Sequence, residues 1–187
     1  MRRVLRCFAL SAAAWSLACL AAPAADSVPS TTVPPGSTAM PTLQDLPVAD
    51  RVVVRKSQRK LLLMSGDSIL RTYKIALGLN PVGHKERAGD FRTPEGTYQL
   101  TRRNSRSEYF LSIQVSYPSE KDVRRARRNR WDPGGAIMIH GLPNQLRHTP
   151  SYYESRDWTD GCIAVSNADM LEIWLLTPEN VSIEIRP

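Results

Sequence analysis

The stretch RVVVRKSQRKLLLMSGDSILRTYKIAL, residues 51–77, decides the fold class of this chain. Its first five residues include three consecutive valines, and β-branched side chains favour strands. Two further apolar runs, 60–64 and 68–77, lie on either side of Ser65-Gly66-Asp67, a composition typical of a hairpin turn. The stretch therefore predicts three strands, two of them joined as a hairpin.

More strands follow along the chain. A long segment rich in Gly and Pro, residues 78–96, predicts a loop. Residues 97–101 and 110–115 alternate well enough to be strands, and 181–185 predict a closing strand. Residues 136–139 are continuously apolar, which favours a buried strand that ends at His140-Gly141.

Two short helices are predicted between these strands. Ser119-Glu120-Lys121-Asp122 resembles a capping box and should open a helix that runs to about Asn129. Ser166 and Asn167 offer a second capped start, for a helix over 168–176 that Pro178 stops. Many strands with two short helices indicate a mainly β domain.

The amino terminus predicts export. Residues 1–24 combine a basic start, an apolar run and a small-residue end, which together indicate a signal peptide. Residues 25–47 are rich in Pro, Ser and Thr and predict a flexible tether, and 48–187 suit one domain. We therefore expect the protein in the periplasm or cell envelope, with a membrane anchor only if Cys19 is lipidated.

The charge pattern bears on partners. The formal net charge is +7, and three of the arginines belong to the predicted signal. Six of the other basic residues cluster within 121–130: Lys121, Arg124, Arg125, Arg127, Arg128 and Arg130. Such a run is typical of nucleic-acid binding, but an exported chain rarely meets nucleic acid, so we expect no such partner. A solvated helix face and contact with an anionic envelope polymer or membrane remain open.

Cys162 is the one cysteine outside the predicted signal, since Cys7 and Cys19 lie within it. An odd cysteine in an exported protein indicates a reactive thiol or intermolecular pairing. We interpret Cys162 as a nucleophile. The alternative is a small buried apolar residue.

His140 is the best candidate for the base that a thiol nucleophile needs. We expect His84 to be exposed in its Gly-rich loop and His148 to be mobile in a polar stretch, whereas a strand delivers His140 rigidly. Gly141 and Gly161 allow close backbone approach, and the N–H groups around Gly161 could form an oxyanion hole. A purely structural role for His140 is the alternative.

These residues resemble the catalytic domain of L,D-transpeptidases, the YkuD family. The likeness spans about 51–187 and rests on Arg59–Leu63, Gly89–Tyr98, Ile137–Gly141 and Thr159–Cys162. It implies a β-sandwich of mixed sheets with short helices, and a cysteine in a cleft under a mobile flap. The segment 105–117 and the loop after Gly141 are both candidates for that flap.

The resemblance also implies an activity on peptidoglycan stem peptides. Cys162 would attack the third stem residue, release D-alanine and pass the acyl group to an amine, which makes a cross-link. His140 would be the general base, and the Gly141 carbonyl would orient it. We expect Thr159, Asp160 and Gly161 on the substrate side, no metal or cofactor, and a monomer.

Three departures from the family pattern leave alternatives open. Asp160 stands where the family usually has histidine, Ala164 where it often has Arg or Asn, and the spacing from His140 to Thr159 is slightly long. A carboxylate beside a thiol raises its pKa unless it is paired. A carboxypeptidase or other hydrolase on the same fold, or a non-catalytic wall-binding module, therefore remains possible. The sequence argues against a zinc hydrolase, because it has no His-Glu-x-x-His motif and only three scattered histidines.

Overall fold

The computed structural model describes residues 46–187. The predicted signal peptide and all but the end of the predicted tether lie outside the described residues. The elements are β1 (Arg51–Arg55), β2 (Lys60–Ser65), β3 (Ser68–Lys74), β4 (Gly96–Ser107), β5 (Phe110–Val115), α1 (Glu120–Arg128), β6 (Met138–His140), α2 (Pro150–Glu154), β7 (Ile163–Ala164), α3 (Asn167–Leu176) and β8 (Ser182–Arg186).

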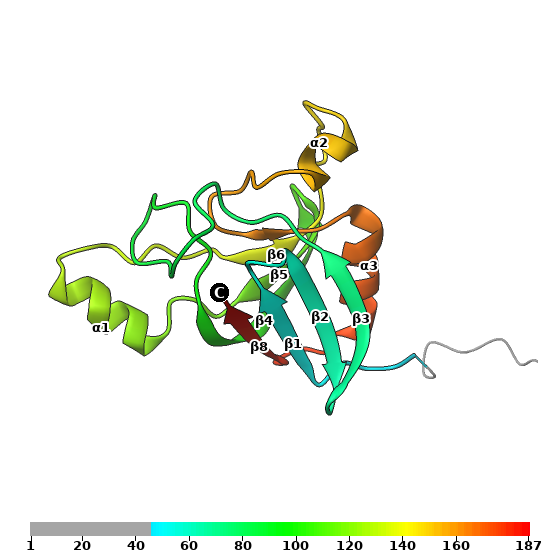
Figure 1. The fold of residues 1–187 in the computed structure, drawn as a ribbon, viewed down its shortest axis with the longest axis horizontal. Helices are drawn as coiled ribbons and strands as arrows, with labels where there is room; N and C mark the ends of the chain where they lie inside the picture. Colours follow the sequence, from blue (N-terminus) through cyan, green and yellow to red (C-terminus); the bar gives the residue numbers. More distant parts are fainter. Residues whose placement is uncertain (1–45) are drawn as a thin grey trace, which may run out of the picture. The chain divides into compact units, whose positions relative to one another are not determined.

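The strands form one mixed sheet in the order β3-β2-β1-β8-β4-β5-β6-β7 (Figure 1). Two pairs, β1 with β8 and β6 with β7, are parallel, and the other neighbours are antiparallel. The amino-terminal part of β4 pairs with β8, and the part from Leu100 onward pairs with β5. The expected mixed sheets are confirmed, and they share β4.

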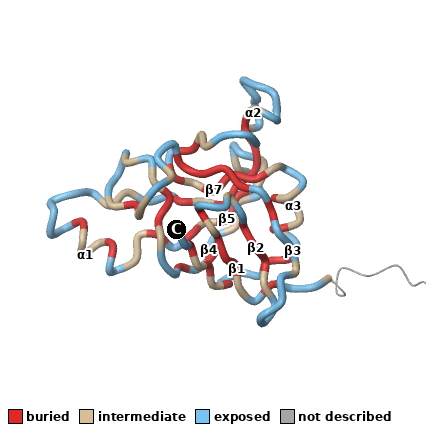
Figure 2. The backbone as a smooth tube through the Cα atoms, in the orientation of Figure 1, coloured by how far each residue is buried: buried red, intermediate tan, exposed pale blue. Residues whose placement is uncertain are grey.

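One apolar core lies between the two parts of the sheet. Val52 of β1 and Leu61 of β2 belong to the same buried cluster as Ile113 of β5 and Ile139 of β6. In Figure 2 buried residues are concentrated in the strands, whereas most residues of α1 and α2 are exposed or intermediate. Burial of this cluster is the main favourable term in folding, and no disulfide is needed for it.

The local predictions are confirmed at the hairpin and at both helix starts. Ser65 pairs with Ser68 across the turn, and Gly66 has a φ of +55°. Ser119 accepts a hydrogen bond from the Asp122 N–H, and the Asp122 carboxylate accepts one from the Ser119 N–H, which completes the capping box of α1. Ser166 caps α3 by accepting from the Asp169 N–H.

Three elements differ from the prediction. β4 runs to Ser107, well beyond the expected end, because its polar half pairs with β5 through two register shifts. The two-residue strand β7 and the helix α2 were not expected. Pro150 occupies the first turn of α2, a position that proline favours, and this was the signal in the sequence that could have found it.

Candidate active site

His140 lies at the end of β6, between two neighbouring strands. It is paired with Ser112 of β5 and with Ala164 of β7. Its Nδ1 is 2.7 Å from the carbonyl oxygen of Gly141, so Nδ1 carries the proton and donates it. This hydrogen bond leaves Nε2 as the nitrogen that can accept a proton.

Aromatic rings surround the His140 imidazole. The ring centroid of Tyr109 is 4.6 Å away and that of Trp158 is 5.6 Å away. The residue is only 4% exposed. Burial lowers the pKa of His140 to about 4, and the hydrogen bond to Gly141 opposes that shift only in part. The imidazole is therefore neutral near pH 7.

The backbone around Cys162 is held by a tight turn. The Thr159 hydroxyl donates to the Cys162 carbonyl at 2.7 Å and accepts from the Gly161 N–H at 3.2 Å. Gly161 has a φ of +129°, and a Cβ there would lie 2.5 Å from the carbonyl oxygen of Arg92. Only glycine fits this position. Since the Gly161 N–H is bonded to Thr159, its role in an oxyanion hole stays a prediction.

The Cys162 thiol is half-buried and points toward the segment that precedes β6. Its Sγ donates to the Ala136 carbonyl at 3.5 Å. Burial raises the pKa of the Cys162 thiol, the backbone of Met138 lowers it, and the nearby Asp160 carboxylate raises it further. The thiol is therefore protonated near pH 7.

Cys162 and His140 line one open pocket of about 380 Å³. Asp160 and Thr159 also line it, so four of the six predicted site residues meet there. Asp160 is exposed, whereas Thr159 is buried. The remaining lining residues are Asn104, Ser107, Glu108, Tyr109, Ser112, Ala136, Met138 and Trp158. Ala164 is buried and lines a different, smaller pocket of about 180 Å³.

The two flap candidates contact each other, but only the segment 105–117 lines this pocket, whereas the loop after Gly141 lines a neighbouring one of about 640 Å³ that shares Glu108, Tyr109 and Trp158 with it. The Gly141 N–H donates to the carbonyl of Tyr109, at the tip of the β4–β5 hairpin. Asn144 accepts from the Phe110 N–H at 2.8 Å and donates to the Ser107 carbonyl at 2.9 Å. The loop after Gly141 therefore holds the hairpin tip beside His140.

Sequence reasoning missed the aromatic residues of the site. Tyr109 lies in the hairpin tip and Trp158 in the loop before the cysteine turn, far from His140 in sequence. Their only local signal was the presence of large aromatic side chains in otherwise polar segments. Tertiary packing brings them to the imidazole.

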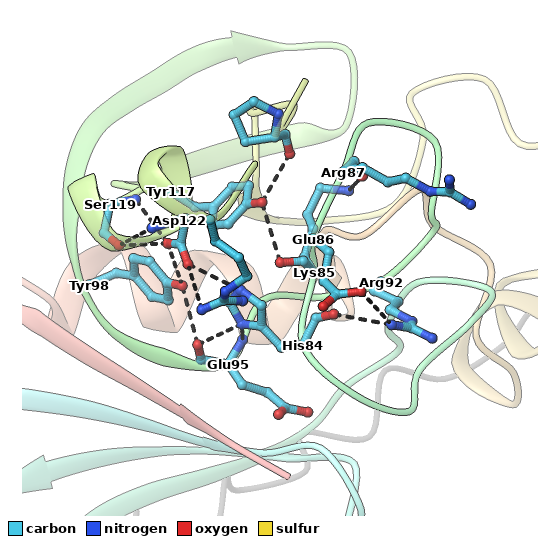
Figure 3. Close-up of polar contacts among 12 residues, drawn as sticks. His84, Lys85, Glu86, Arg87, Arg92, Glu95, Tyr98, Tyr117, Ser119 and Asp122 are labelled. Carbon is cyan, nitrogen blue, oxygen red and sulfur yellow. Dashed lines mark hydrogen bonds and ion pairs between the residues drawn. The ribbon is translucent and has the colours of Figure 1, made fainter. Parts of the chain in front are cut away.

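The expectation of an exposed His84 was wrong. Its side chain is only 16% exposed, and its Nδ1 accepts from the Glu95 N–H at 3.0 Å. Its Nε2 lies 3.1 Å from a carboxylate oxygen of Asp122 (Figure 3). Burial lowers the pKa of His84, and the positive charge of Arg125 adds to that effect. The contact with Asp122 places His84 against α1, away from solvent.

His148 is exposed, and its expected mobility stays a prediction. Its ring stacks on Tyr152 at 4.0 Å between centroids. It lines no pocket with Cys162.

Two further observations bear on function. In the part of the chain that the structure describes, no three His, Cys, Asp or Glu side chains are grouped so that they could hold a metal ion. None of the helices between residues 46 and 187 combines the length and the apolar character that crossing a membrane requires.

Comparison with protein families gives one match over most of the chain. Residues 49–185 match the family model described as the L,D-transpeptidase catalytic domain, YkuD. The chain is also 28% identical over 116 residues to YafK of Escherichia coli strain K12, whose name assigns it provisionally to the L,D-transpeptidases. That alignment covers 60% of this chain and 45% of YafK.

Solved structures share the fold. Pgp2 of Campylobacter jejuni, a helical cell shape determining protein, is 24% identical with a TM-score of 0.54, covering 73% of this chain and 46% of Pgp2. Bd1075 of Bdellovibrio bacteriovorus is 26% identical with a TM-score of 0.51, covering 74% of this chain and 48% of Bd1075. The chain thus spans less than half the length of each of these three relatives.

Proposed function

Because this chain belongs to the L,D-transpeptidase catalytic domain (YkuD) family, we propose that it is a peptidoglycan L,D-transpeptidase with Cys162 as its nucleophile. The family match spans residues 49–185. The observation that carries the proposal is the pocket that Cys162 and His140 line together, with Nδ1 of His140 bonded to the Gly141 carbonyl. That bond leaves Nε2 free to act as a base.

The protonation states favour general-base catalysis over a preformed ion pair. The lowered pKa of His140 and the raised pKa of Cys162 leave a neutral imidazole and a neutral thiol near pH 7. The proton moves to Nε2 of His140 as Sγ attacks, so that charge develops only in the transition state. General-base help of this kind contributes about 10²–10⁴-fold in rate.

The reaction then takes two acyl transfers. In the first, Sγ bonds to the carbonyl carbon of the third stem-peptide residue, the amide bond to D-alanine breaks, and imidazolium of His140 returns the proton to the leaving amine. In the second, His140 accepts a proton from an acceptor amine, which attacks the thioester. A new amide forms and the Cys162 thiol is released.

Asp160 is the observation that favours a second candidate, a hydrolase on the same fold. It contributes an exposed carboxylate to the pocket where this family usually has an imidazole. A carboxylate at this point can orient a water as readily as an amine, and water would give a trimmed stem peptide instead of a cross-link.

One experiment tests both the transpeptidase and the hydrolase. Purified protein is incubated with defined muropeptides, and the products are resolved by mass spectrometry. Cross-linked dimers that disappear in Cys162→Ala support the transpeptidase. Products lighter by one D-alanine, without dimers, support the hydrolase. If a carbapenem adds no mass to the wild-type protein and no muropeptide is converted, the chain is a binding module and both proposals fail.

A further inference from the structure

Helix α1 carries an unusual concentration of positive charge. Six of the ten residues from 121 to 130 are Lys or Arg. Arg124 pairs with Glu120 at 3.1 Å, and Arg125 lies 3.6 Å from Asp122. The other four make no ion pair within residues 46–187; they are Lys121, Arg127, Arg128 and Arg130.

One side of α1 is fixed to the domain, which sets the direction of the charged side. Asp122 and Ala126, four residues apart on one helix face, are buried. The Asp122 carboxylate accepts from the Ser119 hydroxyl at 2.6 Å and from the Tyr98 hydroxyl at 3.1 Å (Figure 3). The opposite side of the helix consequently faces solvent.

We define this opposite side as the basic face, made of Lys121, Arg124, Arg127 and Arg128, all of them exposed. Arg130 and Trp131 extend it past the end of the helix, and Trp131 is 37% exposed. The Arg87 guanidinium lies 5.5 Å from the Trp131 ring centroid and adds another cation there.

Helix stability alone does not account for the basic face. Cations are favourable in the last turn of a helix, which covers Arg127 and Arg128. Lys121, in contrast, lies in the first turn, at the positive end of the helix dipole, and Arg130 lies beyond the helix. Arg124 and Arg128 are like charges four residues apart, an arrangement that destabilises a helix.

The shape of this surface indicates the kind of partner. Figure 1 shows α1 at the periphery of the domain, away from the strands. None of the described pockets is lined by Lys121, Arg124, Arg127 or Arg128. Trp131, past the end of the helix, lines a pocket of about 350 Å³ together with Arg87. A convex cationic surface complements a flat anionic one, whereas a polymer strand is held in a groove. An exposed Trp beside Arg is typical of the headgroup region of a bilayer.

We propose that the basic face of α1 binds the anionic headgroups of a phospholipid bilayer, with Trp131 at the headgroup layer. The interaction is peripheral and electrostatic, and it is therefore weakened by salt. It is independent of the chemistry at Cys162.

Sedimentation of the full chain with vesicles tests the proposal. We expect binding to vesicles of phosphatidylethanolamine and phosphatidylglycerol to exceed binding to phosphatidylcholine vesicles. Each basic residue near such a surface contributes about fivefold in affinity. The triple variant Lys121→Gln/Arg127→Gln/Arg128→Gln should therefore bind the anionic vesicles roughly a hundredfold more weakly.

A matched variant controls for net charge and for any contribution of the amino-terminal segment. Lys60→Gln/Lys74→Gln/Arg102→Gln removes three exposed cations from the strands and should bind as the wild type does. Arg127→Lys/Arg128→Lys keeps the charge and should also bind.

Two results would overturn the proposal. One is equal loss of vesicle binding in the triple variant and its control. The other is binding to isolated peptidoglycan that depends on the basic face while vesicle binding does not, which would assign this surface to the wall polymer. Muropeptide turnover by the triple variant is measured in solution, without vesicles. A failure of the membrane-binding proposal is then distinguishable from a failure of the proposed transpeptidase activity.

Discussion

The surroundings of His140 and His84 differ although both side chains are mostly buried. His140 is packed against Tyr109 and Trp158, and its one hydrogen bond goes to a backbone carbonyl. His84 has a partner on each nitrogen, the Glu95 backbone and the Asp122 carboxylate. Burial lowers the pKa of both imidazoles.

The difference teaches that a carboxylate partner does not by itself mark a catalytic histidine. The His84–Asp122 contact joins the loop 78–96 to α1, and each imidazole nitrogen of His84 lies against a protein group, the Glu95 backbone or the Asp122 carboxylate. The imidazole of His140 keeps one nitrogen free in a pocket that also holds a thiol. The free nitrogen and the thiol in the same pocket make His140, and not His84, the candidate base.

Replacing His140 and His84 in turn is the most direct test of the difference between them. We expect His140→Ala to slow acylation of Cys162 by about 10²–10⁴-fold, because the attacking thiol loses its base. His84→Ala should leave acylation within about tenfold of wild type, since His84 does not line the pocket that holds the thiol. The measurement is the rate of D-alanine release from a defined muropeptide, with circular dichroism to verify folding. Equal losses in the two variants would make His140 a structural residue.

The acid sensitivity of the fold should sharpen the comparison between His140 and His84 further. The unfolded chain protonates His140 near pH 6.5, whereas the folded protein does so only near pH 4. Between these values the unfolded state binds more protons, so the free energy of unfolding falls as pH falls, by roughly 3 kcal/mol in all. Urea unfolding of wild type and His140→Gln at several pH values measures this. Parallel pH profiles for the two proteins would contradict the low pKa.

The contacts that Asp122 makes beside His84 should matter for the stability of the fold and not for the proposed catalysis. Asp122→Ala removes the carboxylate that completes the capping box and that accepts hydrogen bonds from the Ser119 and Tyr98 hydroxyls, which we expect to cost about 2–3 kcal/mol. Arg124→Ala, on the exposed side of the same helix, should cost under about 0.5 kcal/mol. Thermal unfolding measures both. Similar values for the two variants would mean that Asp122 does not anchor α1.

The smallest expected effect concerns Asp160. Burial is the main cause of the raised pKa of Cys162, and the Asp160 carboxylate adds to it. Asp160→Asn should lower that pKa and speed alkylation by iodoacetamide at neutral pH by less than about tenfold. Glu108→Gln neutralises another carboxylate of the same pocket and should change the rate less. A slower reaction in Asp160→Asn would show that the carboxylate favours the thiolate.

Local pattern was enough to predict the mainly β class, the hairpin at Gly66, the capping box at Ser119 and the strand that ends at His140. Each depends on residues a few positions apart, whose spacing sets backbone geometry directly. The lone thiol and the family resemblance also led from sequence to Cys162, His140, Thr159 and Asp160, which line one pocket in the structure; their catalytic roles stay predictions.

Tertiary structure alone decided the rest. The parallel pairs β1–β8 and β6–β7 join segments distant in the chain, and β7 is too short to have a pattern of its own. The packing of Tyr109 and Trp158 on His140, and the burial of His84 under α1, depend on the same long-range pairing. Desolvation then lowers the pKa of both imidazoles, and a residue's degree of burial is a property of the folded chain that its sequence neighbours do not determine.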